Sequence, residues 1–358
     1  MNPLHNKRIL LCAVVMCAFI PVSSQKKHGP DNIILMIGDG MGVAQVYAGY
    51  TASHGTLNLF TFPVTGFSKT YSASDYITDS GAGATAISTG NKTFNGAIGV
   101  GKDTVPAKTI LEYAEEKGLS TGLVATSTIT HATPASFIAH QADRDNYEAI
   151  ANDFLKTDID VFIGGGLEHF SNRKDGRNLL HELRQKGYQV MLSLDSIRNV
   201  SQGKLAGFTS RGSNPSKIEG RGDELPDATR TALSILSRNK KGFFLMVEGS
   251  QIDWGAHANN TESVVSEVLD FDKAVGIALE FARNDEHTLV IVTADHETGG
   301  MILQGGDYVK GTVEGKFATT DHSGVMVPVF AFGPGAERFQ GVQENTDLFV
   351  KMMSLFRF

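Results

Sequence analysis

The stretch IILMIGDGMG, residues 33–42, decides the fold that we expect for this chain of 358 residues. Its first half, residues 33–37, is short and uniformly apolar, which is typical of a strand covered on both faces in a mainly parallel sheet. The run ends in Gly38, Asp39 and Gly40. Glycine and an acidic residue after a buried strand are typical of a tight turn before a helix.

Apolar runs of the same kind recur along the chain, and helical stretches separate them. Helical spacing is clear in residues 263–281, where valine and leucine recur on one face, and residues 109–117 also read as helical. This alternation predicts an α/β fold, a three-layer sandwich with a central, mainly parallel β-sheet flanked by helices. The further runs are residues 122–125, 161–163, 243–247, 289–293 and 327–332.

The first residues of the chain predict export from the cytoplasm. Lys7 and Arg8 precede an apolar run, residues 9–20, and small and polar residues follow it. This order is typical of a signal peptide, which we assign to residues 1–24, and the run is too short for a comfortable membrane span. A buried or amphipathic helix is the alternative, but the run has no polar face. We therefore expect a periplasmic or secreted protein with no stable membrane span after cleavage.

Both cysteines of the chain, Cys12 and Cys17, fall inside that segment. The mature chain is therefore expected to contain no disulfide, and its stability must come from packing and from any bound metal. No repeat or long linker divides residues 25–358, so we predict one domain there. Residues 171–227 are polar, glycine-rich and irregular, and we interpret them as a peripheral insertion whose role the sequence leaves open.

The formal net charge of the chain is −7 at pH 7. A protein that binds nucleic acid through its phosphates needs a basic face. The charge therefore argues against a nucleic-acid-specific partner.

Carboxylates and imidazoles follow several of the predicted strands. Because the carboxyl ends of parallel strands meet at one sheet edge, we expect these side chains to lie close together. Taken singly, an aspartate here is more often a cap or turn residue, and a histidine is more often structural. As a set, without cysteine, they suit zinc and magnesium. The set comprises Asp39, Glu248, Asp253, His257, Asp295, His296 and His322.

Two further motifs need to be weighed against simpler alternatives. Residues 38–42 resemble a dinucleotide-binding loop, but the third glycine is missing and Asp39 would repel a pyrophosphate. Ser80 lies at a turn that lacks the Gly-x-Ser-x-Gly pattern of α/β hydrolases, and it opens a small-residue stretch expected to be helical. A serine there is most often a helix cap, although the same position favours a bound anion.

The order of the motifs resembles the alkaline phosphatase family from about Asn32 to the C-terminus. Residues 171–227 match least. Residues 25–358 would then be the catalytic domain of a phosphomonoesterase, acting on small phosphomonoesters and releasing inorganic phosphate. The motifs that carry the resemblance are residues 33–42, 78–86, 247–257, 293–297 and 321–324.

The resemblance implies two zinc ions, one magnesium ion and a phosphoserine intermediate on Ser80. Arg144 would hold two phosphate oxygens as a planar fork, with Asp79 beside the nucleophile. The first zinc would be bound by Asp253, His257 and His322. The second zinc would be bound by Asp39, Asp295 and His296, and the magnesium by Asp39, Thr133 and Glu248.

Two positions depart from the best-known bacterial pattern of the family. His131 stands where that pattern has aspartate, which would weaken the negative environment of the magnesium site. Trp254 stands where it has lysine and cannot offer a positive charge to phosphate, so we expect weaker phosphate retention. The alternative is that Trp254 has only a structural role, as a hydrophobic residue in the wall of the site. The chain is also short for the family, which leaves a homodimer open.

Two rival functions remain at this stage. The first is a phosphodiesterase of the same superfamily, which would typically use threonine as nucleophile and lack the third metal site. The second is a non-catalytic periplasmic protein that binds phosphate or metal, for which Ser80 would have no purpose.

Overall fold

The computed structural model describes residues 29–358, and the predicted signal peptide, residues 1–24, lies outside them. Ten strands form the central sheet. They are β1 (Asn32–Gly38), β2 (Val64–Lys69), β3 (Ser120–Thr128), β4 (Val161–Gly165), β5 (Gln189–Met191), β6 (Leu205–Phe208), β7 (Phe243–Gly249), β8 (Thr288–Thr293), β13 (Val327–Phe332) and β14 (Gly341–Glu344).

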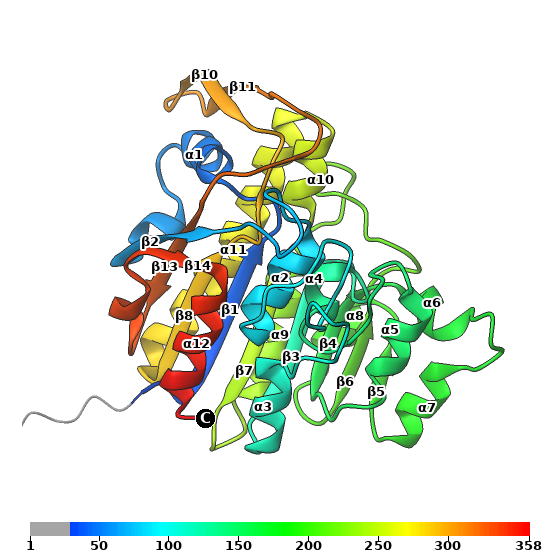
Figure 1. The fold of residues 1–358 in the computed structure, drawn as a ribbon. Coiled ribbons are helices and arrows are strands. Elements are labelled where there is room, and N and C mark those ends of the chain that lie inside the picture. Colours follow the sequence, from blue (N-terminus) through cyan, green and yellow to red (C-terminus); the bar gives the residue numbers. More distant parts are fainter. Residues whose placement is uncertain (1–28) are drawn as a thin grey trace, which may run out of the picture.

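The sheet order is β14-β2-β13-β8-β1-β7-β3-β4-β6-β5. Within it, only β13 runs antiparallel to its neighbours, β2 and β8, while the other pairs are parallel. The predicted mainly parallel sheet is therefore confirmed. The predicted apolar run at residues 33–37 is β1, which pairs with β7 and β8 at the centre of the sheet (Figure 1).

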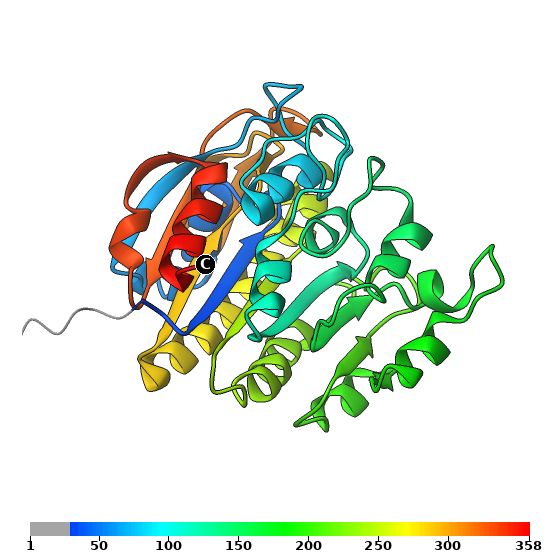
Figure 2. The ribbon, with the colours of Figure 1, turned by 60° about the horizontal axis from the view of Figure 1, so that its bottom comes forward.

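Helices cover both faces of the sheet, as Figures 1 and 2 show. The helices α2, α3, α5, α6, α7 and α12 pack on one hydrophobic core, whereas α1, α8, α9, α10 and α11 pack on the other. Their bounds are α1 (Val43–Ala52), α2 (Ser80–Thr89), α3 (Ile110–Glu116), α4 (Ala132–Ala135), α5 (Tyr147–Asp153), α6 (Leu167–Ser171), α7 (Leu179–Gln185), α8 (Leu194–Arg198), α9 (Glu224–Leu236), α10 (Gln251–His257), α11 (Thr261–Asp285) and α12 (Asn345–Phe356). Two 3₁₀ turns span Asn58–Thr61 and Ala336–Phe339.

The uniformly apolar sequence of β1 follows from this layering. Ile33, Leu35 and Ile37 face the core that contains α2 and α12. Ile34 and Met36 face the core that contains α9 and α11. Because side chains alternate along a strand, a strand buried on both faces has no polar face to show in its sequence.

Two small antiparallel ribbons lie outside the main sheet. One pairs β9 (Glu297–Thr298) with β12 (His322–Ser323), and the other pairs β10 (Ile302–Asp307) with β11 (Thr312–Lys316). Residues 171–227, predicted as a peripheral insertion, include α7, α8, the edge strand β5 and its neighbour β6. None of the helices in the described part of the chain is both long and apolar enough to span a bilayer.

Candidate metal centre and active site

The predicted ligands come from strands that are neighbours in the sheet. Asp39 follows β1, Glu248 lies near the end of β7, and Asp295 and His296 follow β8. Since β7, β1 and β8 run parallel and adjacent, their carboxyl ends meet at one edge. The fold therefore brings these residues together, although they lie far apart in the sequence.

The first cluster consists of Asp253, His257 and His322. Asp253 and His257 lie one turn apart on α10, and the Asp253 Oδ1 atom is 3.3 Å from His257 Nε2 and 3.6 Å from His322 Nε2. The Nε2 atoms of the two histidines are 3.2 Å apart. Their Nδ1 atoms face backbone oxygens, that of Thr320 at 2.6 Å and that of Thr78 at 2.8 Å. A carbonyl only accepts, so each Nδ1 donates and each Nε2 is turned inward as a potential ligand atom.

The second cluster surrounds His296, which is fully buried. Its Nε2 atom lies 3.3 Å from Asp39 Oδ1 and 3.4 Å from Asp295 Oδ2. The same nitrogen is 3.2 Å from the hydroxyl oxygen of Ser80. The candidate nucleophile therefore directly adjoins the ligand atoms of this cluster.

Ser80 is the first residue of α2, but the cap of that helix is its predecessor, Asp79. The Asp79 carboxylate accepts hydrogen bonds from the backbone N–H groups of Ala82, at 2.9 Å, and Gly96, at 3.0 Å. The interpretation of Ser80 as a mere cap is therefore wrong, because the capping function belongs to Asp79. Arg144 donates from Nη1 to Asp79 Oδ2 at 2.8 Å, which fixes the guanidinium beside the start of α2.

The third cluster lies on the other side of Asp39. Ligand-type atoms of Asp39, His131 and Glu248 all lie within 4.8 Å of one another. The Thr133 hydroxyl donates to Asp39 Oδ2 at 3.4 Å, and the Ser127 hydroxyl donates to Glu248 Oε2 at 3.3 Å. Asp39 thus takes part in two clusters.

The buried charge of these clusters is poorly matched by the protein itself. Asp39 Oδ1, Glu248 Oε1 and Asp295 Oδ2 are buried and accept no hydrogen bond from any described residue. Burial, followed by repulsion from neighbouring carboxylates, raises the pKa of Asp39 and of Asp295 well above the ordinary value. Burial also raises the pKa of Glu248 to about 7. Unpartnered buried carboxylate oxygens are costly, and divalent cations are the group that this set of donors fits.

The two positions that depart from the bacterial pattern adjoin one another. The rings of His131 and Trp254 meet edge to face, with centroids 5.9 Å apart. Burial lowers the pKa of His131 to about 4, so the imidazole is neutral at pH 7, and its Nδ1 has no hydrogen-bond partner among the described residues. A neutral imidazole here adds no negative charge to the third cluster.

Several groups that orient the ligands were missed in the sequence. The Thr298 hydroxyl contacts Asp253 and lies 3.2 Å from His296 Nδ1. Backbone oxygens of Thr78 and Thr320 orient two histidines. Backbone carbonyls have no residue-type signature, so nothing in the sequence could identify them. Thr298 follows His296 by two residues, but a threonine is too common for that spacing to be noticed.

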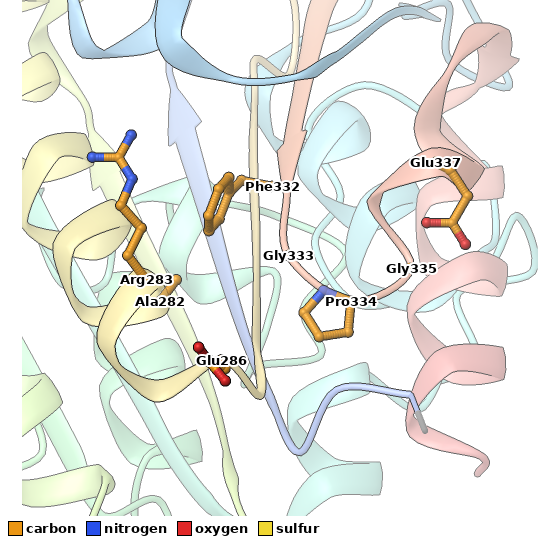
Figure 3. Close-up of a pocket in the computed structure, with 8 residues that line it drawn as sticks. All are labelled: Ala282, Arg283, Glu286, Phe332, Gly333, Pro334, Gly335 and Glu337. Carbon is orange, nitrogen blue, oxygen red and sulfur yellow. The ribbon is translucent and has the colours of Figure 1, made fainter. Parts of the chain in front are cut away.

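The cavity in Figure 3 is separate from this site. Its volume is about 510 Å³, and it is lined by Arg283 and Glu286 at the end of α11 and by residues 332–335 and 337. A Cβ on Gly333 would lie 2.2 Å from the backbone oxygen of Thr288, the first residue of β8. Because Asp295 and His296 follow the last residue of β8, the cavity and the ligand clusters lie at opposite ends of that strand.

Comparison with known proteins gives a consistent family assignment. Residues 30–318 match the model of the family described as alkaline phosphatase. Alkaline phosphatase 4 of Bacillus subtilis is 38% identical over 407 aligned positions, which cover 90% of this chain and 88% of that protein.

Solved structures agree with this assignment. The alkaline phosphatase from the Antarctic bacterium TAB5 is 42% identical with a TM-score of 0.87, covering 93% of this chain and 99% of that one. A mutant of the same enzyme in which a histidine is replaced by aspartate is described with Mg bound in its M3 site, with the same identity and TM-score.

Proposed function

The chain belongs to the alkaline phosphatase family and is a phosphomonoester hydrolase, and we propose that it acts through a covalent phosphoserine intermediate on Ser80. One observation carries this proposal. The Ser80 hydroxyl oxygen lies 3.2 Å from His296 Nε2, at the point where two buried carboxylates also converge on that nitrogen. A helix-start hydroxyl beside such a donor set is placed for activation as a nucleophile.

The clusters would hold three metal ions. Nitrogen and carboxylate donors of Asp253, His257 and His322 suit one zinc, and those of Asp39, Asp295 and His296 suit a second. The oxygen donors of Asp39, Thr133 and Glu248 suit magnesium. Divalent ions bound there would supply positive charge that favours a serine alkoxide and neutralises the phosphate oxygens.

The protein's own residues then account for the steps of the reaction. The Ser80 oxygen attacks phosphorus as the bond to the substrate's alcohol oxygen breaks, and that alcohol leaves with its electron pair and takes up a proton. Arg144, held by Asp79, binds two of the remaining phosphate oxygens as a planar fork. Water then hydrolyses the phosphoserine, which releases inorganic phosphate and restores the Ser80 hydroxyl. Catalysis is mostly electrostatic positioning, so the alcohol group needs little contact and specificity is broad.

His131 and Trp254 would tune this site. A neutral His131 beside Asp39 and Glu248 leaves the third cluster with less negative charge than an aspartate would, which weakens magnesium binding. Support comes from the TAB5 relative, whose His-to-Asp mutant is described with Mg bound in its M3 site. Trp254 gives phosphate no cation, which favours fast product release.

The same proposal includes the surroundings of the enzyme. Residues 1–24 indicate export, which gives a periplasmic or secreted enzyme that meets small phosphomonoesters outside the cytoplasm. A homodimer is compatible with the family.

The direct test compares p-nitrophenyl phosphate with bis(p-nitrophenyl) phosphate as substrates of the purified mature protein. We expect turnover of the monoester, lost on chelation and restored by zinc and magnesium, with kcat/KM at least about 100-fold above that for the diester. Preferential turnover of the diester would identify a phosphodiesterase instead. Metal and phosphate binding without turnover of either ester would identify a binding protein.

A further inference from the structure

The loop that joins β6 to α9, residues 209–223, passes close to the ligand clusters. A Cβ on Gly165, the last residue of β4, would lie 2.3 Å from the backbone oxygen of Gly212 and 3.1 Å from Asn214 Oδ1. The loop therefore touches the sheet at the carboxyl end of β4, next to β3. This is the same sheet edge that carries Asp39 and Glu248.

A buried ionic cluster holds this loop against α11. Arg221 donates to both carboxylate oxygens of Glu267 and, at 2.9 Å, to Asp270 Oδ2. Lys217 donates from Nζ to Asp270 Oδ1 at 2.7 Å and from its backbone N–H to Glu267 Oε1 at 2.7 Å. Two buried carboxylates are thus matched by two cations of the loop, and such paired buried charges hold their partners in one geometry.

A second set of hydrogen bonds holds the loop against the start of α9. Asn214 donates from Nδ2 to Glu224 Oε1 at 2.5 Å and accepts from the Thr209 hydroxyl at 3.0 Å. Asn214 and Glu224 are both buried. The backbone around Asn214 is therefore fixed at both ends of the loop.

Gln251 connects this fixed backbone to the metal-ligand helix. Its Nε2 donates to the backbone oxygens of Asn214, at 3.0 Å, and of Thr126, at 2.9 Å. Gln251 is the first residue of α10, only 2% exposed, and precedes Asp253 by two positions. One amide group thus ties the start of α10 to the loop on one side and to β3 on the other.

The need for such a tie follows from the length of α10. The helix has seven residues and carries both Asp253 and His257. Helices this short are not stable on their own in water, so contacts with the rest of the protein must set their position. Ser250, which directly precedes Gln251, is also tied to β3, because its backbone N–H donates to the Thr126 hydroxyl at 2.9 Å.

We propose that Gln251 is a positioning residue for the metal centre, and that the loop 209–223 is the support against which it works. The ion pairs of Arg221 and Lys217 with Glu267 and Asp270, here called the Arg221 cluster, hold the loop in place. Gln251 binds α10 to this fixed loop, and the position of α10 sets the distances of Asp253 and His257 from His322. The inference rests on the proposed function, since it concerns the same metal ions. It assigns a role to part of the region that the sequence left unexplained.

The test uses the variant Gln251→Met, which keeps the size of the side chain but removes both donors. Its matched control is Gln343→Met in the outermost strand β14, where another buried glutamine donates to a backbone oxygen, that of Phe339, at 3.4 Å. A colorimetric zinc indicator follows release of zinc from the loaded proteins into excess chelator. We expect release from Gln251→Met to be about tenfold faster than from the wild type, as for other groups that support metal ligands. Gln343→Met should stay within about twofold.

Steady-state kinetics of zinc- and magnesium-saturated proteins give a second measurement. Gln251→Met should lower kcat for p-nitrophenyl phosphate by about tenfold while KM stays within about twofold, because Ser80 and Arg144 are untouched. If Gln251→Met does not fold, Arg221→Lys provides the test, since lysine keeps the charge but cannot bind both carboxylates as a fork. We then expect about threefold faster zinc release.

Unchanged zinc release in folded Gln251→Met, or equal acceleration in Gln343→Met, would overturn the positioning role. A wild type that holds zinc but hydrolyses no monoester would overturn the proposed function alone. A wild type that binds neither zinc nor magnesium would overturn both.

Discussion

Two regions of this protein bury several carboxylates, and they neutralise them in opposite ways. At the loop 209–223, Glu267 and Asp270 are matched by Arg221 and Lys217, which the chain itself provides. At the sheet edge around Ser80, oxygens of Asp39, Glu248 and Asp295 face one another without hydrogen-bond donors from the described residues. In the first region the cations are side chains of the protein, whereas the donor set of the second region suits divalent metal ions.

The difference separates structural from functional burial of charge. A buried ion pair made by side chains is permanent and fixes geometry. Around Ser80, by contrast, the pKa values of Asp39 and Asp295 are raised, and the imidazoles beside them face inward. The ionised form of such carboxylates is stabilised when a metal ion binds between them. Substitution, chelation and pH can each test whether the two regions differ in this way.

The largest expected effect comes from Ser80→Ala. This change removes the nucleophile but no ligand, so monoester turnover should fall by about 10⁵-fold while bound zinc and magnesium stay unchanged. Steady-state kinetics and metal analysis of the same preparation measure the two quantities. Activity within tenfold of the wild type would mean that the site around Ser80 binds metal without being the catalytic site.

Chelation should distinguish the regions by stability. Removing ions that were present at about 1,000 times their Kd lowers the free energy of unfolding by about 4 kcal/mol per site. The Arg221 cluster cannot lose its cations in this way. Thermal unfolding with and without chelator measures the loss, and zinc and magnesium should reverse it. An unfolding midpoint that chelator does not move would show that the edge needs no ions.

Glu224→Gln tests a buried carboxylate at the end of the loop 209–223. This carboxylate accepts a hydrogen bond from Asn214 but forms no ion pair with a described residue. Burial raises the pKa of Glu224 from 4.5 to about 7. The native state therefore binds more protons than the unfolded state between pH 4.5 and 7, and stability falls as pH rises through this window. The variant should be more stable than the wild type by about 3 kcal/mol at pH 8, with the difference vanishing near pH 4. Denaturant unfolding across this range checks it, and a pH-independent difference would refute it.

The smallest expected effect comes from Trp254→Lys, which adds a cation to the edge around Ser80. Inorganic phosphate should inhibit this variant about fivefold more tightly, since one partly solvated charge pair contributes about 1 kcal/mol. Trp254→Phe is the control and should leave phosphate inhibition unchanged. Inhibition constants against p-nitrophenyl phosphate measure both, and no tightening with lysine would leave Trp254 as a hydrophobic wall residue.

The sequence allowed the sheet and the clustering of the candidate ligand residues to be predicted because both depend on local patterns. Short apolar runs mark strands buried on both faces, and Asp39 or the pair Asp295-His296 stand directly after them. Residues placed directly after parallel strands lie at a known edge of the sheet, so the clustering of ligands needed no knowledge of distant contacts.

The parts that could not be predicted depend on contacts between distant segments. The inward orientation of His257 and His322 comes from backbone oxygens of Thr320 and Thr78, which no residue type announces. The irregular sequence of residues 209–223 hides that Arg221 reaches α11 and that Gln251 reaches Asn214. The ribbon of β10 and β11 is mostly exposed and lacks the apolar run by which the central strands were found.

The pairing of β12 with β9 also has a consequence for the order in which the protein matures. His322 completes a cluster whose other members lie on α10, while Asp39 sits near the beginning of the described chain. A partial chain that ends before β12 lacks His322, so the proposed zinc of this cluster would be bound only after nearly the whole polypeptide has been made and folded. Contacts of such long sequence separation are also slow to form. If the chain is exported as we propose, the ions of this cluster would be acquired in the compartment where folding ends.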